Sequence, residues 1–132
     1  MGRDVNDLLE KAIYGNPETK PAERRLFLTT IFERVYIALT KKQVQAAPVY
    51  SEVEKTMAKA NNLHLFLNGN LAYGDYAAYI KMAVSQNVPY TIVNPPTPTP
   101  FALVLADKNQ PVQRADRFIK DDLYEIDMAA AD

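Results

Sequence analysis

The stretch from Leu63 to Val93 constrains the fold of this chain more than any other part of the sequence. It begins with an apolar run, LHLFL (63–67), continues with a helical pattern over about 74–86, and ends with a second apolar run, PYTIV (89–93). A strand, a helix and a following strand of this length form a right-handed crossover between parallel strands. The stretch therefore predicts a βαβ unit, and with it a sheet covered by helices.

A similar pattern precedes this unit. An apolar run at 34–39 (RVYIAL) is followed by a helical pattern over about 48–60. Continuous apolar runs are typical of strands that are covered on both faces. Thr40 and Gln43 have the spacing of a capping box, which predicts that the strand ends there and a turn begins. The order strand, helix, strand, helix, strand predicts three parallel strands joined by two crossovers.

A proline-rich connector and a fourth apolar run complete the predicted sheet. Residues 94–100 hold four prolines, which exclude a helix or a central strand and indicate an extended connector. The run FALVLA (101–106) is the fourth predicted strand, and the connector is too short to hold a crossover helix, so we expect antiparallel pairing. The predicted fold is α+β, a three-layer α/β/α arrangement with a mixed four-stranded sheet of three parallel strands and an antiparallel fourth.

The length of 132 residues predicts one domain. Residues 22–32 leave a short helical turn and an extended segment both open, because β-branched residues interrupt the apolar pattern there. A short helix is expected around 113–119. The parts of the predicted domain, which spans 1–132, are an N-terminal helix at 4–14, a βαβαββ core at 33–107 and a C-terminal tail at 108–132.

The composition excludes several kinds of chemistry. The chain has no cysteine, which excludes disulfides and thiolate sites and fits the reducing cytoplasm. His64 is the only histidine and lies in a predicted strand, so we expect a structural side chain with a neighbouring partner and no zinc site. Four scattered glycines exclude a P-loop and a dinucleotide fingerprint. We expect no cofactor and no metal, and binding is favoured over catalysis, although carboxylate-pair catalysis stays open.

Open α/β sheets bind ligands outside the carboxyl ends of their parallel strands. Three predicted loops meet at that edge, and their polar side chains, with backbone amides at helix starts, form a candidate anion site. Tyr73 is placed to stack on a base or ligand ring. Polar turn residues also cap strands and helices for purely structural reasons, and that alternative stays open. The candidate ligand-binding residues are Thr40, Lys41, Lys42, Gln43, Asn68, Asn70, Tyr73 and Asn94.

Two strings in the first third of the chain carry a family resemblance. IYGNPETKPAERR (13–25), followed by ERVYIALTKKQV (33–44), resembles the YueI-like family of small bacterial cytosolic proteins, with the motifs IYG-x-P, ERV and ALT-x-x-QV. The resemblance covers nearly the whole chain. It implies a fold and a cytoplasmic location, and it brings no established activity.

The order of helices and strands is also similar to the ribosomal-protein superfamily that binds kink-turn RNA. The RNA-binding signature of that superfamily is G-x-N-E-x-x-K at the start of the helix after the first strand. This chain has Thr40, Lys41, Lys42 and Gln43 there and no Gly-x-Asn-Glu. Kink-turn contacts are therefore carried over to no residue, and the similarity implies only a general association with RNA.

Two functions follow as alternatives. The first is non-catalytic binding of RNA or a nucleotide-like anion at the strand-end edge, with local lysines as the contacts because the net charge of −1 offers no broad basic surface. The second is a protein–protein interaction or regulatory module that uses the proline connector and the C-terminal tail. No apolar run approaches the about 20 residues of a membrane span, so we expect no membrane partner. The sequence does not define the oligomeric state.

Overall fold

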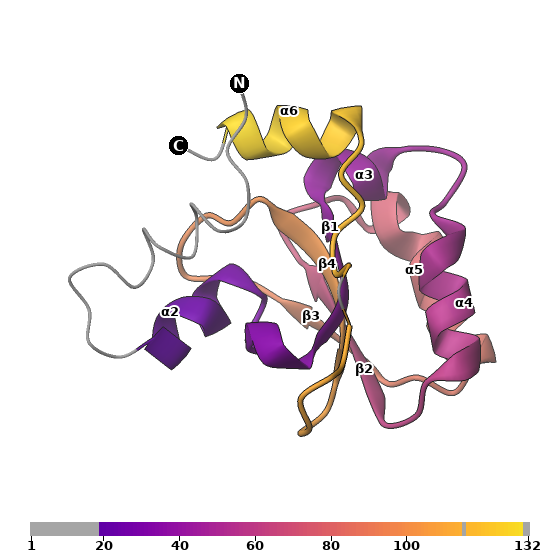
Figure 1. The fold of residues 1–132 in the computed structure, drawn as a ribbon. Helices are drawn as coiled ribbons and strands as arrows, with labels where there is room; N and C mark the ends of the chain where they lie inside the picture. The colour runs from indigo at the N-terminus through magenta and orange to yellow at the C-terminus, as the bar shows by residue number, and fades with distance from the viewer. Residues whose placement is uncertain (1–18, 115, 131–132) are drawn as a thin grey trace.

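A computed structural model of the protein describes residues 19–114 and 116–130 (Figure 1). Its centre is an open four-stranded sheet in the order β1-β4-β2-β3. The helix predicted at 4–14 lies outside the described residues. The strands are β1 (Val35–Thr40), β2 (Leu63–Asn68), β3 (Tyr90–Val93) and β4 (Phe101–Asp107).

The mixed four-stranded sheet with an antiparallel fourth strand agrees with the prediction, but three parallel neighbours are not found. β4 lies between β1 and β2 and is antiparallel to both, so β2 and β3 form the one parallel pair. All seven residues of β4 are buried. A strand that is apolar on both faces is most stable at the centre of a sheet, which explains why β4 separates β1 from β2. β1, β2 and β3 still run in the same direction.

Helices cover the two faces of the sheet unequally. On one side, α4 (Ser51–Lys59) and α5 (Tyr73–Ser85) pack along the strands, while α2 (Thr19–Leu26) lies on the other side (Figure 1). The expected three-layer arrangement is not matched, because no described pair of helices like α4 and α5 packs along the strands on this second face. The second face is covered instead by the end of α2, the loop after it, Phe118 and α6 (Asp122–Ala130).

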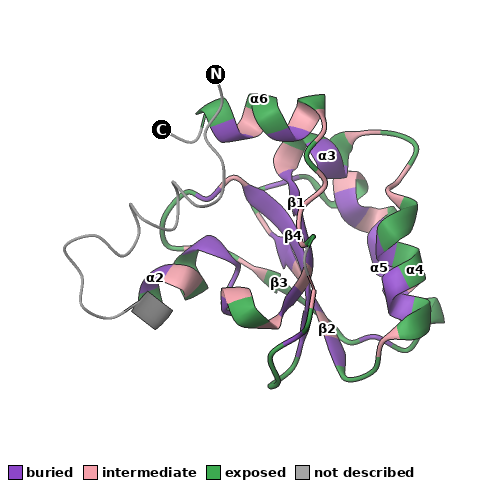
Figure 2. Cartoon of the chain, viewed as in Figure 1, coloured by how far each residue is buried: buried purple, intermediate pink, exposed green. Residues whose placement is uncertain are grey.

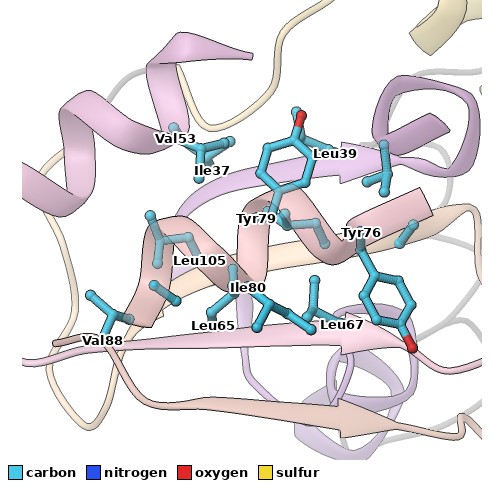
Figure 3. Packing of buried hydrophobic residues seen from close by; sticks show 14 of the residues in the cluster. Ile37, Leu39, Val53, Leu65, Leu67, Tyr76, Tyr79, Ile80, Val88 and Leu105 are labelled. Atoms are coloured by element: carbon cyan, nitrogen blue, oxygen red, sulfur yellow. The ribbon is translucent and has the colours of Figure 1, made fainter. Parts of the chain in front are cut away.

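The core between the sheet and the α4–α5 pair is apolar. Figure 3 shows Tyr79 and Ile80 of α5 lying over the strands. Burial follows this geometry: β1, β2, β4 and the inner helix faces are mostly buried, whereas the outer helix faces and the edge strand β3 are largely exposed (Figure 2). α5 ends where Asn87 adopts a φ of 58°, which is the left-handed conformation typical of a residue that follows a helix.

An aromatic cluster fills the opposite face. The ring of Phe27 stacks on Phe101 with centroids 5.2 Å apart, and Phe118 lies 5.6 Å from Phe101. Directly after Phe27 the chain turns at Leu28 and Thr29, which both have positive φ. The segment at 22–32 is therefore a helix end, a tight turn and the start of η1 (Phe32–Arg34).

The prediction of a helix at 113–119 is wrong. The described residues here, 113–114 and 116–119, form no helix, and 117–118 run beside the outer edge of β1: the N–H of Ala38 donates to the carbonyl of Arg117 at 2.9 Å, and Ala38 and Phe118 form a parallel bridge. The Nε of Arg117 donates to the carbonyl of Val35 at 2.9 Å. An edge strand exposes unpaired backbone groups, and pairing with the tail satisfies them, which a helix here could not do.

Candidate functional site

The ends of the strands meet at one edge of the sheet, as the sequence predicted. Thr40 at the end of β1 pairs with Phe101 at the start of β4. Across β4, the side-chain amide of Asn68 donates to the carbonyl of Phe101 at 3.1 Å. The N–H of Gly69 donates to the carbonyl of Val93 at 2.8 Å, which brings in the end of β3. We call this region the strand-end edge.

At the β1 end of the strand-end edge, the residues of the predicted capping box form hydrogen bonds within the protein. The N–H of Thr40 donates to Oε1 of Gln43 at 2.9 Å, which starts the short helix α3 (Lys41–Gln45). The Nε2 of Gln43 donates to the carbonyl of Ile119 at 2.7 Å and to Oδ1 of Asp121 at 3.0 Å. Both Thr40 and Gln43 are completely buried. The Gln43 side chain therefore holds the tail, and neither side chain is accessible to a ligand.

Asp121 is the centre of the contacts that hold the tail. Its Oδ1 accepts the N–H of Tyr124, so Asp121 also caps the start of α6. Its Oδ2 accepts the hydroxyl of Tyr50. Burial opposes the ionised form of Asp121, but the hydrogen bonds from Tyr50, from the backbone of Tyr124 and from Gln43 lower its pKa below the ordinary value.

Tyr50 is held in its neutral form by the same contact. Burial, then the hydrogen bond to Asp121 and the charge of that carboxylate, raise the pKa of Tyr50 well above its ordinary value. Its backbone N–H donates to the hydroxyl of Tyr79 at 3.0 Å. The cluster of Gln43, Tyr50, Tyr79 and Asp121 is therefore a polar network in which each group has a partner.

At the β2 and β3 ends, one of the three asparagines is structural. Asn68 is buried, and its Oδ1 accepts the N–H of Asn70 at 2.9 Å, which shapes the turn after β2. Asn70 itself is exposed, and so is Asn94. The Asn94 side chain lies against Gly69 so closely that a Cβ at that position would overlap with it.

The remaining candidates lie at the solvent surface of this edge. Lys42 is exposed and Lys41 is half-buried. The N–H of Lys42 donates to Oδ2 of Asp127 on α6 at 2.7 Å, so a carboxylate lies beside the two lysines. Tyr73 is 61% exposed and meets Tyr76 edge to face, with ring centroids 5.7 Å apart.

The structure thus divides the eight predicted residues into two sets. The buried set holds the turn and the tail in place: Thr40, Gln43 and Asn68. The set that reaches solvent at the same edge comprises Lys41, Lys42, Asn70, Tyr73 and Asn94. Sequence reasoning missed Asp121, although an Asp pair directly before the helical pattern of 123–128 is a recognisable helix start.

Metal-ligand clusters, the single histidine and membrane-spanning helices can each be assessed in the described part of the chain. Within residues 19–114 and 116–130, no group of three or more His, Asp or Glu side chains is placed to hold a metal ion. His64 stacks on Phe66 and its Nε2 lies 2.7 Å from Oγ1 of Thr91, which agrees with the structural role predicted for it. None of the described helices is both long and apolar enough to span a membrane.

This combination of a mixed sheet, an α4–α5 layer and a tail fastened across the strand-end edge defines a class of small α+β proteins. Residues 2–117 match the family described as protein of unknown function (DUF1694), and the chain belongs to this family. It is 42% identical over 126 residues to the YueI protein of Bacillus subtilis (strain 168), covering 94% of this chain and 95% of that protein. The resemblance to the YueI-like family is therefore confirmed.

The fold agrees with a solved relative. The crystal structure of the YueI protein from Bacillus subtilis superposes with a TM-score of 0.82 at 39% sequence identity, covering 94% of this chain and 97% of that one. The fold described above is thus shared along nearly the whole length of both chains.

Proposed function

We propose that this protein is a non-catalytic binding protein for RNA or a nucleotide-like anion, and that the ligand lies on the open part of the strand-end edge. The observation that supports this most is the convergence of three loops, each following a strand that runs in the same direction. Each connection leaves polar or aromatic side chains in solvent: Lys41 and Lys42 at the start of α3 after β1, Asn70 and Tyr73 after β2, and Asn94 after β3.

The two lysines supply the attraction for phosphate. Neither ammonium group forms an ion pair with another described residue. Asp127 weakens the local positive potential because its carboxylate lies beside the backbone of Lys42. Two lysines with a nearby acid favour modest, salt-sensitive affinity, so the asparagines and Tyr73 must supply hydrogen bonds and stacking.

RNA is the favoured ligand by analogy. The similarity to the kink-turn RNA-binding superfamily supports an RNA role, although the absence of Gly-x-Asn-Glu means that the contacts must differ from those of that superfamily. A cysteine-free chain also fits the reducing cytoplasm, where RNA is abundant.

The test is salt-dependent binding of a mixed-sequence oligoribonucleotide. We expect a logarithmic salt slope of about −1.4, from two phosphate contacts at about 0.7 each. The variant with Lys41→Ala and Lys42→Ala should lose most of this slope and affinity. Lys81→Ala, an exposed lysine on α5, is the matched control and should change neither. Equal affinity of the double variant and the control, or no binding of the wild type at low salt, would contradict the proposal.

A protein–protein interaction or regulatory module is the second candidate. Ile126 on the tail helix is 50% exposed, and a pocket of about 190 Å³ lies between α2 and the connector, lined by Leu26, Thr97 and Pro98 among others. Affinity capture from a bacterial lysate, with bound RNA and bound protein both sequenced, separates the two roles. An enriched protein without RNA would support the module and oppose RNA binding.

A further inference from the structure

A second concave surface lies away from the strand-end edge, along the outer side of β1. It is an open groove of about 430 Å³. One wall is the exposed side of α4, which contributes Lys55 and Lys59, and the other is the extended tail, which contributes Arg114. Tyr36, near the amino end of β1, lies between them. We call this surface the α4–tail groove.

A β-bulge directs Tyr36 into this groove. Val35 pairs with Ala106 and Ile37 pairs with the next residue, Leu105, so Tyr36 is an extra residue in β1. Bulges change the direction of a side chain, and here Tyr36 and Ile37 both contact the core on the α4 side. Tyr36 is only partly buried and contributes to the lining of the groove.

The charge of the groove is unbalanced. Three cationic side chains line it against one carboxylate, that of Glu52. Lys55 and Lys59 are four residues apart on α4, where like charges repel, and both are exposed. Arg114 uses its Nε to bind the carbonyl of Asp116 at 2.8 Å, and none of the three cations forms an ion pair with another described residue. A bound anion would relieve this repulsion.

We propose that the α4–tail groove binds a nucleoside phosphate, with the phosphate between Lys55, Lys59 and Arg114 and the base against Tyr36. The volume falls within the range of small-ligand pockets, about 300–1,000 Å³. Arginine and lysine converging from two segments match the oxygens of a phosphate, and a tyrosine ring stacks on any base. The groove lies beside the amino end of β1, whereas the strand-end edge lies beyond its carboxyl end, so this proposal does not depend on the proposed function.

The experiment is calorimetric titration of the full chain at low salt with AMP, ribose 5-phosphate and adenosine. AMP should bind more tightly than either of the other two, because only AMP carries both the phosphate and the base. Lys55→Gln, Lys59→Gln and Arg114→Gln should each weaken AMP binding about two- to fivefold. Lys81→Gln is the control and should leave it unchanged.

The base contact is tested separately. Tyr36→Leu should reduce the affinity for AMP to that for ribose 5-phosphate, whereas Tyr36→Phe keeps the ring and should retain the AMP affinity. Because Tyr36 also packs against the core, the Phe variant shows whether a loss comes from stacking or from unfolding. AMP binding that is absent at low salt, or that is insensitive to the three cation substitutions, would overturn the proposal.

A free nucleotide and one nucleotide of an RNA chain present the same chemistry. A mixed-sequence oligoribonucleotide that binds more tightly than AMP, and that weakens with Lys55→Gln, indicates an RNA chain, while tighter AMP binding indicates a free nucleotide. The variant with Lys41→Ala and Lys42→Ala should leave AMP binding unchanged, so the two proposed sites succeed or fail separately. AMP binding lost only in that double variant would overturn the groove site.

Discussion

The side-chain amide of Gln43 donates a hydrogen bond of 2.7 Å to the backbone carbonyl of Ile119, which lies 76 positions later in the chain. The same nitrogen donates to Asp121, and the side-chain oxygen accepts the N–H of Thr40. Gln43 is completely buried. One glutamine therefore joins the end of β1, the start of α3 and the tail, which explains why the tail lies across this part of the strand-end edge.

Gln43→Ala should destabilise the protein by about 2–4 kcal/mol, because it removes three hydrogen bonds and leaves buried partners unsatisfied. The free energy of unfolding, measured by urea denaturation, checks this. Gln45→Ala on the same helix is the control: Gln45 is exposed and bonds Asp75 at 3.3 Å, so its loss should change stability by at most about 0.5 kcal/mol. Equal effects of the two substitutions would show that the tail is not held through Gln43.

Asp121 should make the attachment of the tail sensitive to acid. Its pKa is lowered in the folded state, so the folded protein holds the ionised form more strongly than the unfolded chain does. This stabilisation is present above the ordinary value of 3.8 and is lost as the pH falls below it. The difference in unfolding free energy between wild type and Asp121→Asn should therefore be constant above about pH 5 and shrink in more acidic solution.

Asp122→Asn, at the exposed neighbouring position, is the matched control for this prediction. Because Asp122 forms none of the contacts with Gln43, Tyr50 and Tyr124 that surround Asp121, its substitution should cost much less stability at neutral pH. A difference between wild type and Asp121→Asn that stays constant down to pH 3 would show that the carboxylate does not supply this stability.

The strands and the two long helices could be predicted because each leaves a local pattern. Apolar runs identified β1, β2 and β4 to within one or two residues, and the helical patterns predicted to end near 60 and 86 do end close to Asn62 and Asn87, which have positive φ. The strand order could not be predicted in this way. The strand order depends on which apolar strand is most completely buried, and this is a property of the whole sheet. Here β4 is buried along its whole length and lies between β1 and β2.

The sequence indicates where the loops of the candidate site meet, but it does not indicate which of their side chains are accessible. The loops do meet at one edge, because the direction of the strands follows from the connections. Whether a polar turn residue faces a ligand or the chain itself depends on distant partners. Ile119 and Asp121 belong to the tail and bind the side chain of Gln43. The path of the tail could not be predicted from its sequence, because its backbone is held by a hydrogen bond to β1.

Two glycines at this edge should respond to alanine in opposite ways. At Gly74, in the first turn of α5, a Cβ meets nothing within 4 Å, so Gly74→Ala should stabilise the helix by about 0.5–1 kcal/mol. At Gly69 a Cβ would overlap with the Asn94 side chain and lie 3.1 Å from Ile92. Asn94 is exposed and can turn away, so Gly69→Ala should cost less than about 1 kcal/mol.

Two-dimensional NMR distinguishes these outcomes. Gly69→Ala should shift the side-chain amide resonance of Asn94, and Gly74→Ala should leave it in place while raising the unfolding midpoint. If Asn94 contacts the proposed anion, Gly69→Ala should also weaken oligoribonucleotide binding without loss of fold. An unmoved Asn94 resonance in Gly69→Ala would show that the two residues are not in contact.

His64 should introduce a pH dependence near neutrality. Burial, followed by the positive charge of Lys108, lowers the pKa of His64 below 6.5. As the pH falls below 6.5, the unfolded chain binds a proton before the folded protein does, so the free energy of unfolding should decrease. Because His64 is the only histidine, this change should be visible between about pH 5 and 7, above the range in which carboxylates titrate.

His64→Gln removes the titrating group and keeps a polar side chain within reach of Thr91. Its unfolding free energy should be flat across the same pH window, while that of the wild type declines on the acid side. The ring resonances of His64 give the pKa directly by NMR titration. A measured pKa at or above 6.5 would mean that burial and the charge of Lys108 do not disfavour the charged ring at this position.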